Sequence, residues 1–147
     1  MDLKYENFNK MKKKILFICK HNKFRSKVGE AIFNKLNKNK NIIAESAGTI
    51  GSDNPTPYNV VKILREKGYR VARMKARKIN LKKINDYDIL IVVADNVDPQ
   101  LFKDSGYRWK IIWWKVSDCM SIYVPGIRKR VDDIEKRVKK LIKRLGD

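Results

Sequence analysis

Short apolar runs alternate with polar stretches along the chain and predict the strands of a sheet. The runs at residues 14–18, 42–44 and 88–93 consist almost entirely of isoleucine, leucine, valine and other apolar residues. Such runs are typical of strands that are buried on both faces of a sheet. Residues 109–116 predict a further strand, and residues 69–71 predict a weak strand or extended segment.

Three longer segments carry apolar residues at helical spacing. The first covers residues 26–37, and the last is a long amphipathic helix over residues 127–145. Between them, Thr56 can cap a helix with Pro57 at its first position, and Gly68 is typical of its end. The alternation of strands and helices predicts an α/β fold, with three layers (α/β/α) around a central, mainly parallel, four-stranded sheet. In such a sheet, ligands bind beyond the carboxyl ends of the strands.

The chain length suits one domain. Its 147 residues are enough to enclose a hydrophobic core. We expect residues 1–10 to be a flexible polar lead-in and residues 11–147 to form a single domain. The apolar runs are too short to cross a bilayer, and the N-terminus lacks the pattern of a signal peptide. These features favour a cytoplasmic protein with no membrane partner.

The charge of the chain is strongly positive. Lysine and arginine number 35 against 16 aspartates and glutamates, which gives a formal net charge of +19. One interpretation is attraction to nucleic acid or another polyanion. The basic residues are spread along the chain, however, and no helix-turn-helix, zinc-finger or RNP pattern is present. A biased composition is therefore the preferred interpretation, and nucleic-acid binding is the less favoured one.

The two cysteines predict reactive thiols rather than structural disulfide bonds. Cys19 and Cys119 lie a hundred residues apart, and His21 is the single histidine of the chain. This set is too sparse for a disulfide framework or a zinc site, so we expect two thiols and neither a metal nor another cofactor.

The segment from Cys19 to Ser26, with the sequence CKHNKFRS, joins a predicted strand to a predicted helix. Its backbone amides and the helix N-terminus can converge on an anion, and a thiol at such a point is stabilised as the thiolate. Arg25 can hold a tetrahedral oxyanion with two parallel hydrogen bonds. The Ser26 hydroxyl can donate a hydrogen bond to the thiolate. The segment therefore predicts a nucleophile held beside a phosphate-like ligand.

The run ILFICKHNKFRSKVGEAIF, followed by ESAGT at residues 45–49 and DYDILIVV at residues 86–93, resembles the low-molecular-weight protein tyrosine phosphatase family. This family also contains the thioredoxin-coupled arsenate reductases. The resemblance covers nearly the whole chain after Met11. It implies hydrolysis of a phosphorylated protein or a small phosphomonoester through a cysteinyl-phosphate intermediate, with inorganic phosphate or arsenate as ligand. The alternatives are an arsenate reductase and a non-catalytic module that binds phosphate or phosphopeptides.

The resemblance also implies roles for individual residues. Cys19 corresponds to the nucleophile and Arg25 to the phosphate clamp. Asn22, Ser26 and Ser46 correspond to a polar network that supports the loop. The phosphate-binding residues implied are Lys20, His21, Asn22, Lys23, Phe24, Arg25 and Ser26.

The general acid of the family is an aspartate followed by proline. Asp118 matches it best by position, although Cys119 stands in place of the proline. Asp95 and Asp98, which follow the strand at residues 88–93, are rival candidates.

Several loop and flanking residues depart from the family pattern. His21 stands where glycine is usual, and Lys23 and Phe24 replace an apolar residue and often a second cysteine. His21 is interpreted either as a solvent-facing residue or as an extra contact to the ligand. The aromatic residues that flank phosphotyrosine are missing from residues 49–55, and Met74 stands where many relatives carry histidine. Tyrosine specificity therefore stays open.

The reductase branch needs further cysteines after the strand at residues 88–93, yet residues 94–104 contain none. Cys119 is thus the candidate partner of Cys19, either in a redox switch or in a one-step reduction. The tryptophans at positions 109, 113 and 114 are predicted to pack in the core and on the sheet face.

Overall fold

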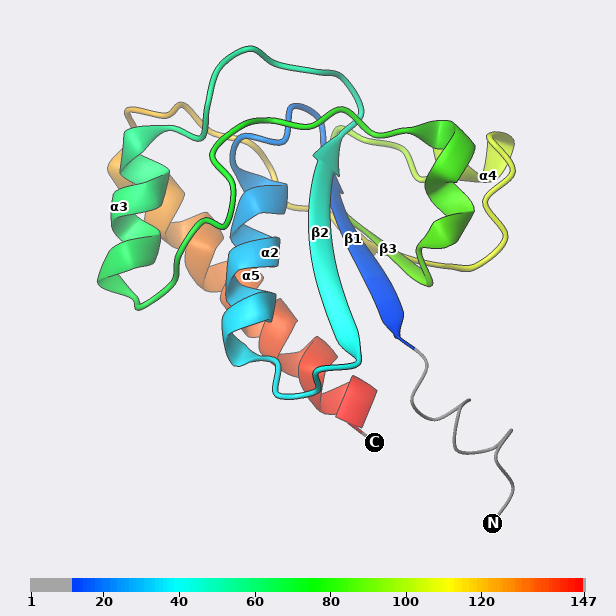
Figure 1. Ribbon diagram of the computed structural model, residues 1–147. Helices are drawn as coiled ribbons and strands as arrows, with labels where there is room; N and C mark the ends of the chain where they lie inside the picture. The colour runs from blue at the N-terminus through cyan, green and yellow to red at the C-terminus, as the bar shows by residue number, and fades with distance from the viewer. Residues whose placement is uncertain (1–11, 147) are drawn as a thin grey trace.

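Four parallel strands form the centre of the protein in the computed structural model, which describes residues 12–146. They are β1 (Lys13–Cys19), β2 (Ile42–Gly48), β3 (Ile89–Val93) and β4 (Lys110–Trp114). Their spatial order is β2-β1-β3-β4 (Figure 1). β2 lies on one side of β1, and β3, the next strand along the chain, lies on the other side of β1. The strand order therefore reverses at β1, and a ligand crevice is expected beyond its carboxyl end.

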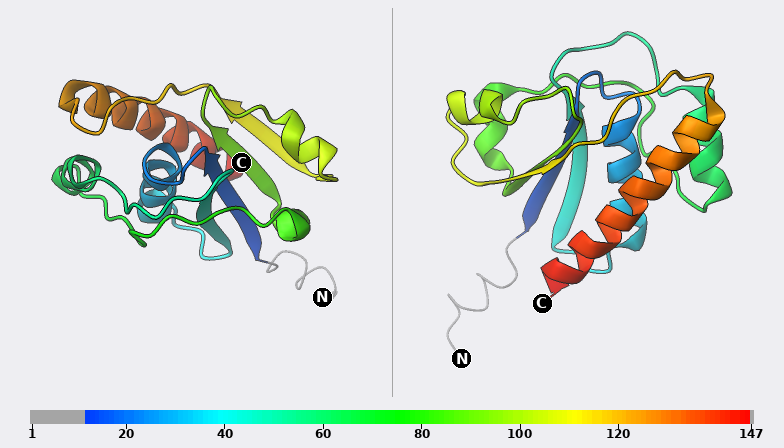
Figure 2. Two further views of the ribbon diagram at one scale, coloured as in Figure 1. Left: turned by 90° about the horizontal axis from the view of Figure 1, so that it is seen from above. Right: turned by 180° about the vertical axis from the view of Figure 1, so that it is seen from behind.

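Helices cover both faces of this sheet, as the two views of Figure 2 show. α2 (Arg25–Leu36), α3 (Tyr58–Glu66) and α5 (Val124–Gly146) pack on one face. The 3₁₀ helix η1 (Leu81–Asp86) and the short α4 (Gln100–Asp104) cover the other. The three-layer α/β/α fold with a parallel four-stranded sheet is thus confirmed. No helix among residues 12–146 combines the length and the apolar character needed to cross a membrane.

The alternation of side chains along β1 builds a separate core on each face of the sheet. Ile15 and Phe17 face the larger cluster beneath α2, α3 and α5, whereas Leu16 and Ile18 face the cluster beneath η1 and α4. All four side chains are at most 1% exposed, which explains why this strand is a continuous apolar run. A Cβ on Gly29 of α2 would lie 2.7 Å from the Phe17 ring. The glycine thereby allows α2 to lie close against β1.

Some predicted boundaries are wrong. Of the two alternatives for residues 69–71, a weak strand or an extended segment, the strand is wrong. Instead, the buried Tyr69 hydroxyl donates a 2.5 Å hydrogen bond to Glu135 of α5, and burial together with this carboxylate raises the pKa of Tyr69 to about 12. The N-cap of α3 is Pro57 rather than Thr56. β2 continues to Gly48, and η1 and α4 were not predicted. The lead-in expected over residues 1–10 lies outside the described residues.

The tryptophan prediction is correct for one residue of three. Trp114 is 8% exposed and packs against Phe17, whereas Trp109 and Trp113 are 55% and 38% exposed. Trp114 belongs to the cluster beneath α2, α3 and α5, whereas Trp113 alternates to the other face of β4, an edge strand, and Trp109 precedes this strand. Trp113 still has one fixed contact, because its indole N–H donates to the Ala94 carbonyl at 2.7 Å.

Candidate active site

A pocket of about 320 Å³ lies at the carboxyl end of β1. Its polar wall includes Cys19, His21, Lys23, Arg25 and Asp118. Its apolar lining is built by Phe24, Pro57, Val60 and Ile127. The loop between β1 and α2 thus meets α3, α5 and the segment after β4 at one place. This is the end of the sheet where the strand order reverses.

Cys19 is the last residue of β1, and its thiol is held by a neighbouring hydroxyl. The Cys19 Sγ and Ser26 Oγ atoms are 2.9 Å apart, and both residues are buried. Arg25 and Ser26 open α2, whose N-cap residue, Phe24, makes no side-chain cap hydrogen bond. The first turn also lacks acidic residues. Its N–H groups are therefore available to an anion in the pocket.

Asn22 determines the shape of the loop. Its φ of 57° lies in the left-handed region, which asparagine tolerates better than most residues do. The side chain is fully buried, and its Nδ2 donates to Ser26 Oγ at 2.8 Å and to Ser46 Oγ at 3.0 Å. Its Oδ1 accepts a hydrogen bond from the Arg77 N–H at 2.8 Å. One side chain therefore joins the loop to β2 and to the segment that follows α3.

Two buried charges behind the loop have no counterpart in the sequence analysis. Ser46 Oγ donates to Glu30 at 2.6 Å, and burial raises the pKa of Glu30 against the opposing effect of this bond. Lys27 is 1% exposed, and its ammonium donates to the Arg73 and Lys75 carbonyls at 2.7 and 2.9 Å. Burial lowers the pKa of Lys27. Glu30 is thus connected to the loop through Ser46 and Asn22, and Lys27 holds the segment that leads to Arg77.

Gly48, at the end of β2, touches the backbone of the loop. A Cβ at this position would lie 2.8 Å from the Lys20 carbonyl oxygen and 2.9 Å from the Asn22 nitrogen. Backbone atoms cannot give way as a flexible side chain can. Glycine is therefore required if the loop is to keep this shape.

Gly48→Ala is expected to lower the free energy of unfolding by about 1–3 kcal/mol through overpacking and to reduce any activity of the pocket. Gly51→Ala is the matched control, since the nearest atom to its added Cβ is 3.9 Å away. Chemical denaturation of the two variants measures the difference. Equal stabilities would contradict this account of Gly48.

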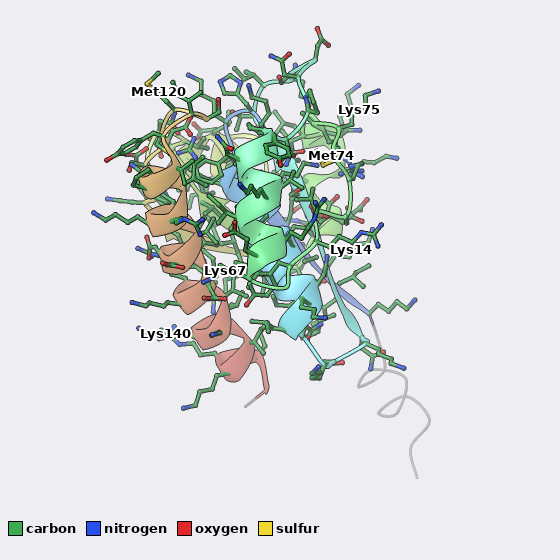
Figure 3. All side chains as sticks on the ribbon, turned by 90° about the vertical axis from the view of Figure 1, so that its left-hand side faces the viewer. Lys14, Lys67, Met74, Lys75, Met120 and Lys140 are labelled. Atoms are coloured by element: carbon green, nitrogen blue, oxygen red, sulfur yellow. The ribbon has the colours of Figure 1, made fainter. Side chains whose placement is uncertain are left out.

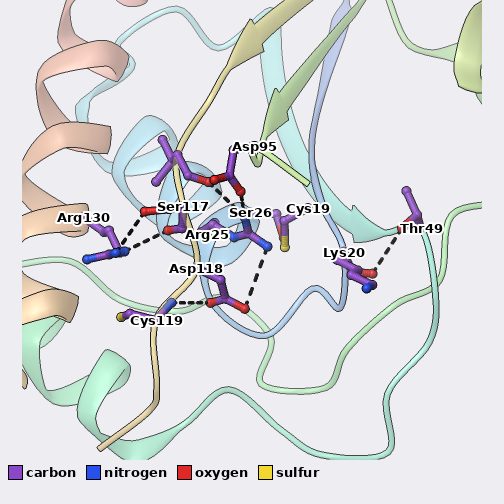
Figure 4. A network of polar contacts seen from close by, with 11 residues as sticks. Cys19, Lys20, Arg25, Ser26, Thr49, Asp95, Ser117, Asp118, Cys119 and Arg130 are labelled. Atoms are coloured by element: carbon purple, nitrogen blue, oxygen red, sulfur yellow. Dashed lines mark hydrogen bonds and ion pairs between the residues drawn. The ribbon is translucent and has the colours of Figure 1, made fainter. Parts of the chain in front are cut away.

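Arg25 reaches the pocket from the first turn of α2 and is 2% exposed. Its Nη1 donates to the Val116 carbonyl at 2.9 Å and lies 3.6 Å from Asp95. Its Nη2 lies 3.9 Å from Asp118 (Figure 4). The guanidinium is therefore held in place by the segments that follow β3 and β4.

The three candidate acids differ in position. Asp118 is half exposed and lines the pocket, whereas Asp95 contacts Arg25 without lining it. Asp98 lies elsewhere, because its carboxylate accepts the backbone N–H of Gln100 at 2.9 Å at the start of α4. Asp118 is thus the carboxyl group best placed to reach a ligand in the pocket.

The segment that carries Asp118 is fastened to two helices. Arg130 of α5 donates to the Ser117 carbonyl at 2.8 Å and to the Ser117 hydroxyl at 2.9 Å. Asn59 of α3 donates to the Ser121 carbonyl at 2.9 Å. The Asp118 carboxylate also accepts the backbone N–H of Cys119 at 2.9 Å. Sequence reasoning missed Arg130, because one arginine among the many basic residues of this helix carries no distinguishing signal.

Not every predicted loop residue reaches the pocket. His21 and Lys23 are half-buried and line it, and Phe24, which is 8% exposed, forms part of its wall. Lys20 is exposed and is absent from the lining. Met74 is 41% exposed and lies on the outer surface beside α3 (Figure 3), so it takes no part in the pocket either.

Cys119 is the second thiol of the pocket. Neither cysteine forms a disulfide, and burial raises the pKa of Cys119. In Figure 4 its side chain extends to the opposite side of Asp118 from Cys19. Among residues 12–146, no group of three or more histidine, cysteine, aspartate or glutamate side chains is arranged to hold a metal ion.

Comparison with known sequences gives one family. The model of the family described as low molecular weight phosphotyrosine protein phosphatase matches residues 14–147. A curated relative, the low molecular weight protein-tyrosine-phosphatase YfkJ of Bacillus subtilis (strain 168), is 36% identical over 90 residues. These residues make up 56% of this chain and 58% of that protein, so the match spans little more than half of the relative's length.

Solved structures share the fold over most of the chain. An arsenate reductase from Archaeoglobus fulgidus DSM 4304 is 29% identical with a TM-score of 0.71, and the alignment covers 88% of this chain and 98% of that one. A low molecular weight protein tyrosine phosphatase from T. tengcongensis is 22% identical with a TM-score of 0.78, covering 90% and 99% of the two chains. The second likeness concerns the fold alone. Phosphatases and arsenate reductases thus both occur among the similar structures.

Proposed function

Because the chain belongs to the low molecular weight phosphotyrosine protein phosphatase family, we propose that it hydrolyses phosphomonoesters through a cysteinyl-phosphate intermediate. One observation carries the proposal. The Cys19 thiol, 2.9 Å from the Ser26 hydroxyl, opens into a pocket that also receives the Arg25 guanidinium and the Asp118 carboxylate. A nucleophile, an anion clamp and an acid are the groups that phosphoryl transfer to cysteine requires.

In the first step, the Cys19 thiolate attacks phosphorus as the bond from phosphorus to the ester oxygen breaks. Asp118, protonated, donates its proton to the departing oxygen. The Arg25 guanidinium and the N–H groups at the start of α2 stabilise the charge on the remaining phosphate oxygens. The Ser26 hydroxyl donates to the Cys19 sulfur and stabilises it as a thiolate.

In the second step, the Asp118 carboxylate takes a proton from a water molecule, and this water attacks phosphorus. The bond between sulfur and phosphorus breaks, inorganic phosphate leaves, and Cys19 returns to the thiolate. Arg25 supports both steps, because the Val116 carbonyl and Asp95 keep its guanidinium at the pocket throughout. Neither step calls for a further cofactor.

Asp118→Asn tests the assignment of the acid. Asp95→Asn is the comparison, because Asp95 is the other carboxylate that contacts Arg25. We expect kcat for phenyl phosphate to fall about 10²–10⁴-fold in Asp118→Asn, the usual contribution of a general acid. The loss should shrink for an ester whose leaving group, such as nitrophenolate, departs without a proton. Asp95→Asn should give a smaller loss that does not depend on the leaving group. The reverse pattern would assign the acid to Asp95.

Arsenate reduction is the second candidate, favoured by the 29% identity to the Archaeoglobus fulgidus arsenate reductase and by the second thiol of the pocket. In this reaction Cys19 would bond to arsenic with loss of water. Cys119 would then attack the Cys19 sulfur, so that arsenite leaves with the electron pair and a disulfide forms. An external dithiol would reduce that disulfide.

Turnover of the wild-type protein distinguishes the candidates. Hydrolysis of phenyl phosphate that persists in Cys119→Ser supports the phosphatase. Arsenite production that requires dithiothreitol and is lost in Cys119→Ser supports the reductase. Binding of inorganic phosphate without either turnover would overturn both and leave a binding module.

A further inference from the structure

We propose that the pocket selects phosphomonoesters that carry a second anionic group beside the phosphate to be removed, and that Lys23 is the residue that determines this preference. The proposal rests on the phosphatase activity proposed above and names its substrate class. Lys23 is a specificity residue here: it contacts the leaving group, while Cys19, Arg25 and Asp118 carry out the reaction.

Lys23 differs from Arg25 and Lys27, the two cations that follow it in the loop and the first turn of α2. Arg25 has a carbonyl and two carboxylates within 4 Å, and Lys27 has two carbonyls. Lys23 is half-buried in the pocket wall, and no ion pair or side-chain hydrogen bond within residues 12–146 engages its ammonium. The same holds for His21 beside it. Both side chains are therefore available to a ligand in the pocket.

The pocket has room for such a ligand. Its volume of about 320 Å³ falls within the range of small-molecule sites, about 300–1,000 Å³. It can accommodate a ring as well as a phosphate group. The apolar wall of Pro57, Val60 and Ile127 suits the hydrocarbon part of the leaving group. A carboxylate on that group can then reach Lys23, whereas an ammonium would meet the positive charges of Lys23 and Arg25.

The charge of the whole chain and a contact with Lys23 favour an anionic leaving group by different routes. A net charge of +19 attracts the more anionic of two substrates more strongly at long range, but salt screens this attraction between exposed charges. A contact with Lys23 is short-range, so its loss changes the preference between leaving groups where the loss of a distant charge does not. The local effect is therefore measurable as a ratio between substrates, and it should persist in about 0.2 M salt, because half-buried pairs are screened less.

The experiment compares two aryl phosphates that carry either a carboxymethyl or an aminomethyl group at the meta position of the ring. We expect wild type to show the higher kcat/KM for the carboxymethyl ester. Lys23→Met keeps the hydrocarbon stem and removes the charge, and it should lower the ratio of the two values about fivefold to tenfold, the size of one close charge pair that stays in contact with water. Lys23→Glu should invert the preference. Comparing this ratio between variants cancels the intrinsic reactivity of the two esters.

Lys143→Met is the matched control, since it removes one equal charge from an exposed position near the far end of α5. Its ratio should equal that of wild type. A ratio that Lys23→Met and Lys23→Glu leave unchanged, in variants that still hydrolyse phenyl phosphate, would overturn this proposal and leave the phosphatase intact. A wild type that hydrolyses none of the three esters would overturn the phosphatase proposal and this one with it.

Discussion

Serine in place of Cys19 is expected to eliminate turnover of aryl phosphates, with kcat reduced about 10⁴–10⁶-fold, the loss typical of removing an enzyme's nucleophile. A serine hydroxyl ionises far less readily than a thiol, and no histidine or carboxylate of residues 12–146 is hydrogen-bonded to the side chain at position 19 to activate it. The protein should still fold, because the side chains are nearly the same size and the Ser26 hydroxyl can bond to either. Steady-state kinetics measures the loss.

Two further measurements give this result its meaning. Calorimetric titration of Cys19→Ser with inorganic phosphate should show that binding is retained, because Arg25 and the N–H groups of α2 are unchanged. Cys119→Ser is the matched exchange at the other thiol of the pocket, and it should keep most of the hydrolytic turnover. Residual activity of one per cent or more in Cys19→Ser would assign the nucleophile to another group.

Arg25→Lys is expected to lower kcat/KM about 10³-fold, even though the positive charge is kept. Arginine grips an oxyanion with two parallel donors, whereas lysine offers one point charge on a flexible stem. Removing the arginine that stabilises the transferring phosphoryl group typically lowers kcat about 10³–10⁵-fold. The 2% exposure of Arg25 and its bond to the Val116 carbonyl also mean that lysine leaves a buried acceptor with a poorer partner.

Arg128→Lys provides the comparison, because Arg128 pairs with Glu66 on the outside of α5 and α3 and does not line the pocket. Its kinetics should match wild type. The affinity for phosphate should fall in Arg25→Lys together with kcat/KM, which a simple loss of stability would not produce at a temperature where both variants are folded. A loss below tenfold in Arg25→Lys would argue against the clamp.

The elements that can be predicted from the sequence are those whose apolar residues form one continuous run or one long periodic pattern. β1 and β3 are short apolar runs because both faces of each strand are buried, and α5 is long enough for its periodicity to be unmistakable. η1 and α4 were missed because each is five or six residues long and buries a single side chain, Ile84 or Phe102. No periodicity can be read from one buried residue.

The same distinction applies to the site. Cys19 and Arg25 lie in one loop, and their spacing is readable without any knowledge of the fold. Lys27 and Arg130 were not predicted, because both donate to backbone carbonyls. The partner of Lys27 lies 46 residues later in the chain, and that of Arg130 lies 13 residues earlier. Every residue has a carbonyl, so such a partner leaves no mark on the sequence. Trp109 shows the opposite error, in which an apolar residue was assigned to the core although it lies beside an edge strand.

The bonds of Asn22 have a consequence for the order in which the protein assembles. The loop spans eight residues, yet its left-handed residue is held by Ser46 and by the backbone of Arg77, 24 and 55 positions later. A chain emerging during synthesis contains the complete loop well before residue 77 is available to brace it. We therefore expect the ability to bind phosphate to appear late, after the segment beyond α3 has docked. A feature that is local in the sequence is acquired through long-range contacts, whose formation is the slow part of folding.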